Sequence, residues 1–181
     1  MEVEQKLRIA VAAAVQLPNV SDMEFEASLM ELRELAKTLG FKVVHTFVQK
    51  RTSFETTGYL GVGKRQEIRA FVHGEPIFDE AGDQILSLAE SNLPEIDAIL
   101  VDHEISPSQA RNLEVEAGCE VMDRTMVILE IFHRNARSRA AKAQVEIARL
   151  GYMAPRLREA AKLAGPQGRQ RSGVGGRGAG E

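Results

Sequence analysis

Four short apolar runs alternate with longer amphipathic stretches over the first two thirds of the chain. They cover residues 9–15 (IAVAAAV), 43–48 (VVHTFV), 98–101 (AILV) and 120–122 (EVM). The runs are almost continuously apolar rather than alternating with polar positions, which is typical of strands buried on both faces of a sheet. The pattern therefore predicts four strands in a sheet that is covered on both sides.

The amphipathic stretches between these runs predict helices. The first is expected over residues 22–39, with Asp22 as its N-cap. The others are expected over residues 64–72, over about 81–92, and from Pro107 to Gly118 behind a Ser106 cap. Strands that alternate with helices need crossover connections, so the predicted fold class is α/β, with a small, mainly parallel four-stranded sheet flanked by helices.

A heptad repeat begins after the last predicted strand. Its apolar positions are separated alternately by four and three residues, and they are Ala136, Ala140, Ala143, Ile147, Leu150, Ala154, Leu157 and Ala161. This spacing predicts a long helix whose apolar stripe, the Ala136–Ala161 seam, needs a partner helix. Pro155 lies inside the pattern and is expected to kink or interrupt the helix. The chain offers no second heptad, so the partner is expected from another chain or from a continuation of this one.

Composition and charge divide the chain into three parts: an α/β unit over residues 1–123, the long basic helix over 124–164, and a Gly/Arg-rich tip loop or flexible tail over 165–181. Residues 1–133 carry 12 Lys and Arg against 23 Asp and Glu, whereas residues 134–181 carry 11 against 3. The net charges are −11 and +8, and this asymmetry indicates a polyanionic partner for the C-terminal part.

The overall composition excludes several classes of protein. Hydrophobic residues make up 44% of the chain, which is too many for a disordered protein. No apolar run reaches the ~20 residues that a membrane-spanning helix needs, so no membrane contact is expected. The acidic, polar start is wrong for a secretory signal, and a single cysteine, Cys119, excludes a disulfide framework. A cytoplasmic location is expected.

One glycine-rich stretch invites a nucleotide-binding interpretation. Residues 58–65 read GYLGVGKR, but a P-loop needs Ser or Thr after the lysine, and Arg65 stands there. Gly61, Gly63, Lys64 and Arg65 could still hold a phosphate at the start of a helix, or they could simply form the turn that begins it. No other constellation predicts a catalytic residue or a metal site, since the histidines lack ligand spacing.

The basic C-terminal part gives the strongest indication of a binding site. The candidate RNA-binding residues are Arg137, Arg139, Lys142, Arg149, Arg156, Arg158, Lys162, Arg169, Arg171 and Arg177. Arginine supplies bidentate phosphate contacts, and glycine lets the backbone approach a polyanion closely. From composition alone, a flexible cationic terminus without a partner remains equally open.

Three stretches resemble the N-terminal region of the HflX family of ribosome-associated GTPases. They are residues 59–68 (YLGVGKRQEI), residues 101–114 (VDHEISPSQARNLE), and the segment that begins VMDRT at residue 121 and runs through residue 157. The glycine-rich end, residues 173–181 (GVGGRGAGE), is similar to the family's tip loop. The resemblance covers nearly the whole chain in the family's order.

The resemblance implies an α/β subdomain, a two-helix antiparallel coiled coil, and then a Ras-like domain that binds GTP and magnesium. In that layout the long helix is the first half of the coiled coil, and the GTPase domain lies outside these 181 residues. This chain alone is then expected to need no cofactor and not to hydrolyse GTP. The resemblance further implies binding of the large ribosomal subunit and its rRNA, with ribosome splitting or rescue under stress in the full-length parent.

Two alternatives stay open at this point. The first is a stand-alone adaptor without GTPase function that pairs its seam with another protein or with itself. The second is an ATP-binding module that uses the loop from Gly61 to Arg65.

Overall fold

The computed structural model describes residues 6–55, 57–86 and 95–169. Its centre is a four-stranded sheet in the order β2-β1-β5-β6, in which every neighbouring pair is parallel. The strands are β1 (Arg8–Gln16), β2 (Phe41–Lys50), β5 (Ala98–Val101) and β6 (Glu120–Asp123). The four apolar runs therefore form the predicted sheet, and the α/β fold class is confirmed.

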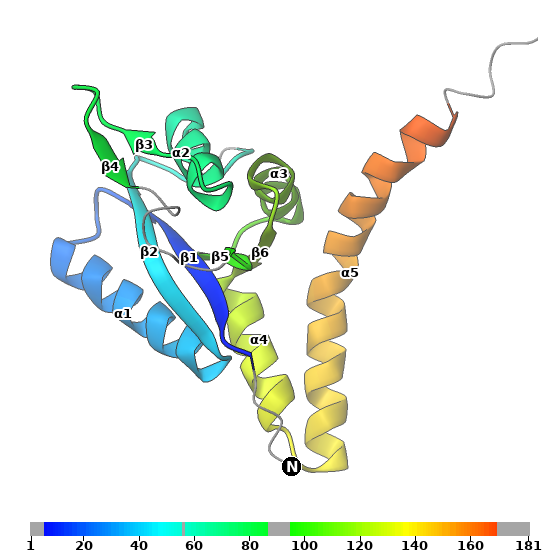
Figure 1. The fold of residues 1–181 in the computed structure, drawn as a ribbon. Helices are drawn as coiled ribbons and strands as arrows, with labels where there is room; N and C mark the ends of the chain where they lie inside the picture. Colours follow the sequence, from blue (N-terminus) through cyan, green and yellow to red (C-terminus); the bar gives the residue numbers. More distant parts are fainter. Residues whose placement is uncertain (1–5, 56, 87–94, 170–181) are drawn as a thin grey trace, which may run out of the picture.

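Helices cover both faces of this sheet (Figure 1). On one face α1 (Asp22–Thr38) and α4 (Arg124–Asn135) enclose a core that joins Leu32 and Val127 to Ala12 of β1. On the other face α2 (Val62–Val72) and α3 (Pro107–Ala117) enclose a second core around Val11 and Ile99. Since β1 and β5 are buried on both faces, their nearly continuous apolar sequence is explained.

Local capping chemistry sets the helix boundaries. Ser21, and not Asp22 as predicted, is the N-cap of α1, because its side chain accepts the N–H of Glu24 while the Glu24 carboxylate accepts the N–H of Ser21. Ser106 forms the same capping box with Gln109, so the predicted start of α3 is confirmed. Gly118 ends α3 at φ +75°, a backbone conformation that glycine adopts without strain.

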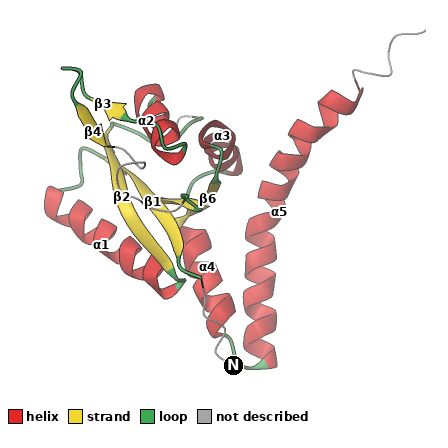
Figure 2. Ribbon diagram, in the orientation of Figure 1, coloured by secondary structure: helices red, strands yellow, loops and turns green. Residues whose placement is uncertain are grey.

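The helix predicted over residues 81–92 is wrong as far as the structure describes that segment. β3 (Ile77–Phe78) and β4 (Gln84–Leu86) form a short antiparallel hairpin instead (Figure 2), and residues 87–94 lie outside the described part. The Asp79 carboxylate accepts the N–H groups of Ala81 and Asp83, and Gly82 has φ +86°. This turn chemistry overrides the weak helical pattern.

The predicted long helix is broken into α4 and α5 (Arg139–Arg169) by a short connection at residues 136–138. Ala136 is extended after α4, and the Ser138 hydroxyl accepts the N–H of Ala141 in the first turn of α5. α5 then runs back beside α4 in the opposite direction (Figure 1). It continues through Pro155, and beyond its middle it leans away from the direction of its first turns.

No helix in the described part of the chain is long and apolar enough to cross a membrane.

Candidate nucleic-acid interface

The cations of α5 and of the connection before it divide into an outward and an inward group. Arg137, Arg139, Lys142 and Arg158 are exposed and have no ion pair with any residue that the structure describes. Lys162 is also exposed, but its ammonium pairs with Glu159, with Nζ 2.7 Å from Oε1. The outward group of Arg137, Arg139, Lys142 and Arg158 can therefore bind a polyanion without first breaking an ion pair with a buried residue.

Two of the predicted RNA-binding arginines point toward the body of the protein instead. Arg149 Nε lies 2.6 Å from Glu130 Oε1 on α4, and this hydrogen bond raises the pKa of the Arg149 guanidinium. Arg156 Nη2 donates to the carbonyl of Ile105 at 2.8 Å and lies 3.0 Å from Asp123 Oδ2. In the structure both arginines therefore bind the protein's own oxygen atoms.

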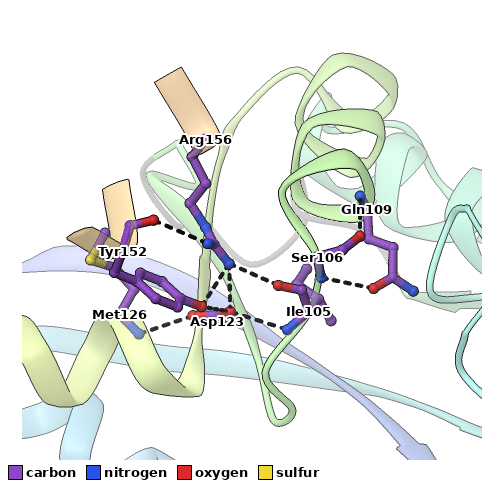
Figure 3. A network of polar contacts seen from close by, with 7 residues as sticks. All are labelled: Ile105, Ser106, Gln109, Asp123, Met126, Tyr152 and Arg156. Carbon is purple, nitrogen blue, oxygen red and sulfur yellow. Dashed lines mark hydrogen bonds and ion pairs between the residues drawn. The ribbon is translucent and has the colours of Figure 1, made fainter. Parts of the chain in front are cut away.

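Asp123 is the centre of the polar network shown in Figure 3. Its carboxylate accepts the N–H of Met126 at 2.9 Å, which caps α4, and the N–H of Ile105 at 3.1 Å. It also accepts the hydroxyl of Tyr152 and pairs with Arg156, whose guanidinium lies 3.8 Å above the Tyr152 ring. Burial, followed by the hydrogen bond to Asp123, raises the pKa of Tyr152, so its hydroxyl remains a donor.

The sequence analysis did not anticipate the partners of Asp123 on α5. Asp123 is the last residue of β6, whereas Tyr152 and Arg156 lie about 30 residues later in the sequence, on α5. The only signal in the sequence is their spacing of four, which places the two side chains on the same face of one helix. A further polar contact of α5, from Arg111 of α3 to the carbonyl of Glu159 at 3.2 Å, has no signal in the sequence.

The last three predicted cations lie at the end of the described part of the chain or beyond it. Arg169 is the last residue of α5, and Arg171 and Arg177 lie outside the described residues.

The glycine-rich loop begins α2, as predicted, although the helix starts two residues earlier than expected. Gly61 is its N-cap and makes no side-chain capping bond, while its own N–H donates to Gln49 at 2.8 Å. Lys64 pairs with Glu67 at 2.9 Å, and Arg65 pairs with Glu116 of α3 at 2.6 Å. A Cβ on Gly58 would lie 2.7 Å from the Arg65 guanidinium carbon, so glycine makes room for that arginine.

Because both cations already have acidic partners, we expect this loop to start a helix rather than to hold a nucleotide. Titration of the chain with ATP, followed by calorimetry, should show no saturable binding, and the Lys64→Ala variant should give the same trace. Saturable binding that the substitution abolishes would instead establish the phosphate site that the sequence left open.

Aromatic side chains fill the carboxyl edge of the two central strands, where open parallel sheets commonly bind ligands. Tyr59 is fully buried; its hydroxyl accepts the N–H of Val15 at 3.1 Å and lies 2.7 Å from His103 Nδ1. Phe54 stacks on His103 with ring centroids 4.3 Å apart. Burial lowers the pKa of His103 and so favours the neutral imidazole, which can accept the Tyr59 proton.

Asp102, at the same edge, has a structural role. Its buried carboxylate accepts the Ser28 hydroxyl at 2.8 Å and pairs with Arg124 of α4 at 2.7 Å. Arg124 also pairs with Glu31 of α1, so Asp102 helps to hold α1 and α4 together on one face of the sheet. The sequence analysis did not anticipate the pair of Asp102 with Arg124.

Cys119 shows no sign of reactivity. Burial raises the pKa of its thiol to about 11, so the nucleophilic thiolate is scarce at neutral pH.

Comparison with known proteins gives the family. The model described as GTP-binding GTPase N-terminal matches residues 26–133, and the model for the GTP-binding GTPase middle region matches residues 135–181. The GTPase HflX of Gluconacetobacter diazotrophicus is 43% identical over the whole chain, which spans 42% of that protein. The GTPase HflX of Escherichia coli is 33% identical over 95% of the chain, which spans 34% of that relative.

A solved structure shares the fold. The crystal structure of a GTP-binding protein from the archaeon Sulfolobus solfataricus in complex with GDP superposes with a TM-score of 0.54 at 26% identity. The similarity covers 90% of this chain and 42% of the archaeal one. The present chain thus spans less than half the length of the relatives it matches. From the two family models and the relatives together, the chain belongs to the HflX family of GTPases, whose N-terminal and middle regions it carries.

Proposed function

We propose that this chain is the ribosome-binding part of an HflX-type GTPase and that α5 is the arm by which it contacts rRNA of the large subunit. The observation that carries the proposal is the outward group of Arg137, Arg139, Lys142 and Arg158, which are exposed and lack ion pairs among the described residues. The acidic body of the chain repels phosphate, so these cations give the molecule one electrostatically favourable side.

In the full-length parent, this contact belongs to a GTPase cycle. We propose that GTP and magnesium bind in the region of the relatives that lies beyond the present 181 residues. The nucleotide would favour the ribosome-bound state, and the factor would split or rescue stalled ribosomes under stress. This role places the protein in the cytoplasm.

The apolar seam fits a second helix in the same assembly. Ile147, Leu150 and Leu157 are 72%, 54% and 61% exposed, although a coiled-coil seam is normally covered. We propose that a further helix lies antiparallel on this face, which would complete a coiled coil whose tip carries the Gly/Arg-rich residues.

The exposed seam also favours the adaptor, in which the helix comes from another protein or from a second copy of this chain. Sedimentation velocity distinguishes the two functions. Self-association that rises with concentration and disappears in Ile147→Gln would support the adaptor, whereas a monomer at all concentrations would count against it.

Salt-dependent RNA binding tests the main proposal. The logarithm of the affinity for a large-subunit rRNA fragment should fall linearly with the logarithm of salt concentration, because bound phosphates release counterions. A variant with glutamine at Arg137, Arg139, Lys142 and Arg158 should bind more weakly, and its slope should be smaller in magnitude by about 3, since each phosphate contact contributes roughly 0.7–0.9. Fluorescence anisotropy at several salt concentrations measures both quantities.

The matched control replaces four exposed lysines of the body, Lys6, Lys37, Lys42 and Lys50, by glutamine, so that it loses the same number of positive charges. That variant should bind as the unmodified chain does. Equal losses in the two variants would mean that the RNA recognises general charge and not the arm.

A further inference from the structure

The long helix α5 makes a series of polar contacts with the body, beside the half-buried apolar side chains of Val145 and Met153. No described side chain of α5 is fully buried, and none belongs to the hydrophobic cores of the α/β unit. An ordinary amphipathic helix turns its apolar stripe inward. In α5 the apolar seam faces outward instead, with Leu150 and Leu157 more than half exposed.

The inward contacts form a single stripe along the helix. Arg149, Tyr152, Arg156 and Glu159 follow one another at intervals of three, four and three residues, so they share one face. At 3.6 residues per turn, the centre of this stripe lies roughly 160° from the centre of the seam. The helix can therefore keep its polar stripe on the body while its seam takes a partner helix.

Within this stripe, Tyr152 and Arg156 reach a buried, hydrogen-bonded point of the body. Their shared partner Asp123 is 3% exposed and is tied by backbone N–H groups both to the start of α4 and to Ile105 in the loop before α3. Arg156 also binds the Ile105 carbonyl at 2.8 Å, so its guanidinium spans the end of β6 and that loop (Figure 3). The Tyr152 ring lies under the guanidinium and limits the conformations that it can adopt.

The other anchors of α5 are weaker. The Arg149 and Glu130 side chains are each about a quarter exposed, and those of His133 and Glu146, whose Nδ1 and Oε2 atoms lie 3.3 Å apart, are nearly half exposed. Arg111 donates to the Glu159 carbonyl at 3.2 Å, but its guanidinium lies 3.8 Å from the Glu159 carboxylate. Solvent-accessible ion pairs of this kind contribute about 0–1 kcal/mol and are screened by salt. The connection at residues 136–138, in which Ala136 is extended, joins α5 to α4 without a continuous helix. The direction of α5 therefore depends on its side-chain contacts.

We propose that Tyr152 and Arg156 are positioning residues, which latch α5 onto Asp123 and so set the direction in which the arm presents its outward cations. The latch itself is a contact within the chain and does not depend on any partner. Its role in presenting the outward cations to RNA rests on the proposed function. It also divides the arginines by role: Arg156 positions the arm, whereas Arg158, two residues later on the outward face, meets the polyanion.

Electron paramagnetic resonance distances between two spin labels test the latch. The labels are placed at Met30→Cys on α1 and Ala161→Cys on α5, both exposed positions, in a Cys119→Ser background. The unmodified latch should give a single narrow distance distribution. Arg156→Leu and Tyr152→Phe should each broaden it or add a second distance, while the thermal unfolding of the α/β unit changes little. Both substitutions leave the capping bonds of Asp123 in place, which Asp123 variants would not.

The matched control is Arg158→Leu, which removes the same charge from the same helix and should keep the narrow distribution. In the RNA assay the roles reverse: Arg158→Leu should reduce the salt slope by about 1, and Arg156→Leu should keep it. Narrow, unshifted distances in both latch variants would overturn the latch. Broadened distances in a chain that binds no RNA would support the latch and overturn the proposed function.

Discussion

Replacing Asp123 by alanine is expected to lower the free energy of unfolding by about 3–5 kcal/mol, the range observed when one partner of a buried ion pair is removed. The Asp123 side chain is 1% exposed and accepts hydrogen bonds from four groups, which belong to Ile105, Met126, Tyr152 and Arg156. Alanine leaves the Ile105 N–H and the Arg156 guanidinium without their carboxylate and removes the N-cap of α4. Urea unfolding followed by circular dichroism measures the loss.

Glu120, at the opposite end of the same strand, supplies the matched control. Its carboxylate also pairs with an arginine, Arg8, at 3.0 Å, but both side chains are about half exposed. Glu120→Ala should therefore cost less than about 1 kcal/mol. If the Asp123 and Glu120 variants lose the same stability, the buried hydrogen bonds of Asp123 contribute no more than an exposed ion pair.

The second large effect is expected at Tyr59. Tyr59→Ala removes a fully buried ring between the sheet and the loops at its carboxyl edge, and it should cost about 3–5 kcal/mol. Tyr59→Phe keeps the ring but leaves the buried N–H of Val15 without its acceptor, for which about 1–3 kcal/mol is expected. Burial raises the pKa of Tyr59, so the cost should be constant across neutral pH.

An exposed aromatic residue provides the comparison for Tyr59. Phe132 on α4 is 55% exposed, and Phe132→Ala should change stability by no more than about 0.5 kcal/mol. The order Tyr59→Ala, Tyr59→Phe, Phe132→Ala in thermal unfolding is the expected result. A Tyr59→Phe variant as stable as the unmodified chain would show that the bond to Val15 contributes nothing.

The sheet could be predicted because its signal is local. Residues of β1 and β5 are buried on both faces, so hydrophobicity alone marks them. The start of α3 could be predicted for a similar reason, since Ser106, Pro107 and Gly118 act through neighbouring backbone groups. The hairpin of β3 and β4 was missed because Asp79 and Gly82 form a turn within a segment whose apolar residues also fit a helix.

The inward face of α5 could not be predicted, because its partners are distant in the sequence. The sequence shows Arg149, Arg156 and Arg158 only as three cations on one helix. In the structure Arg149 pairs with Glu130 and Arg156 pairs with Asp123. The break between α4 and α5 was equally hidden, since the heptad spacing of alanines continues across residues 136–140. The packing of α5 beside α4 determines which arginines remain available to RNA, and this packing cannot be predicted from the spacing of residues along the helix.

Binding to purified ribosomal subunits tests the central claim most directly. The chain and its variant with glutamine at Arg137, Arg139, Lys142 and Arg158 are sedimented separately with large and with small subunits at near-physiological salt. We predict that the unmodified chain pellets with the large subunit in a saturable manner, and that the variant largely stays in the supernatant. Equal binding to both subunits, or equal binding of the chain and the variant, would contradict the claim that the outward face of α5 recognises the large subunit.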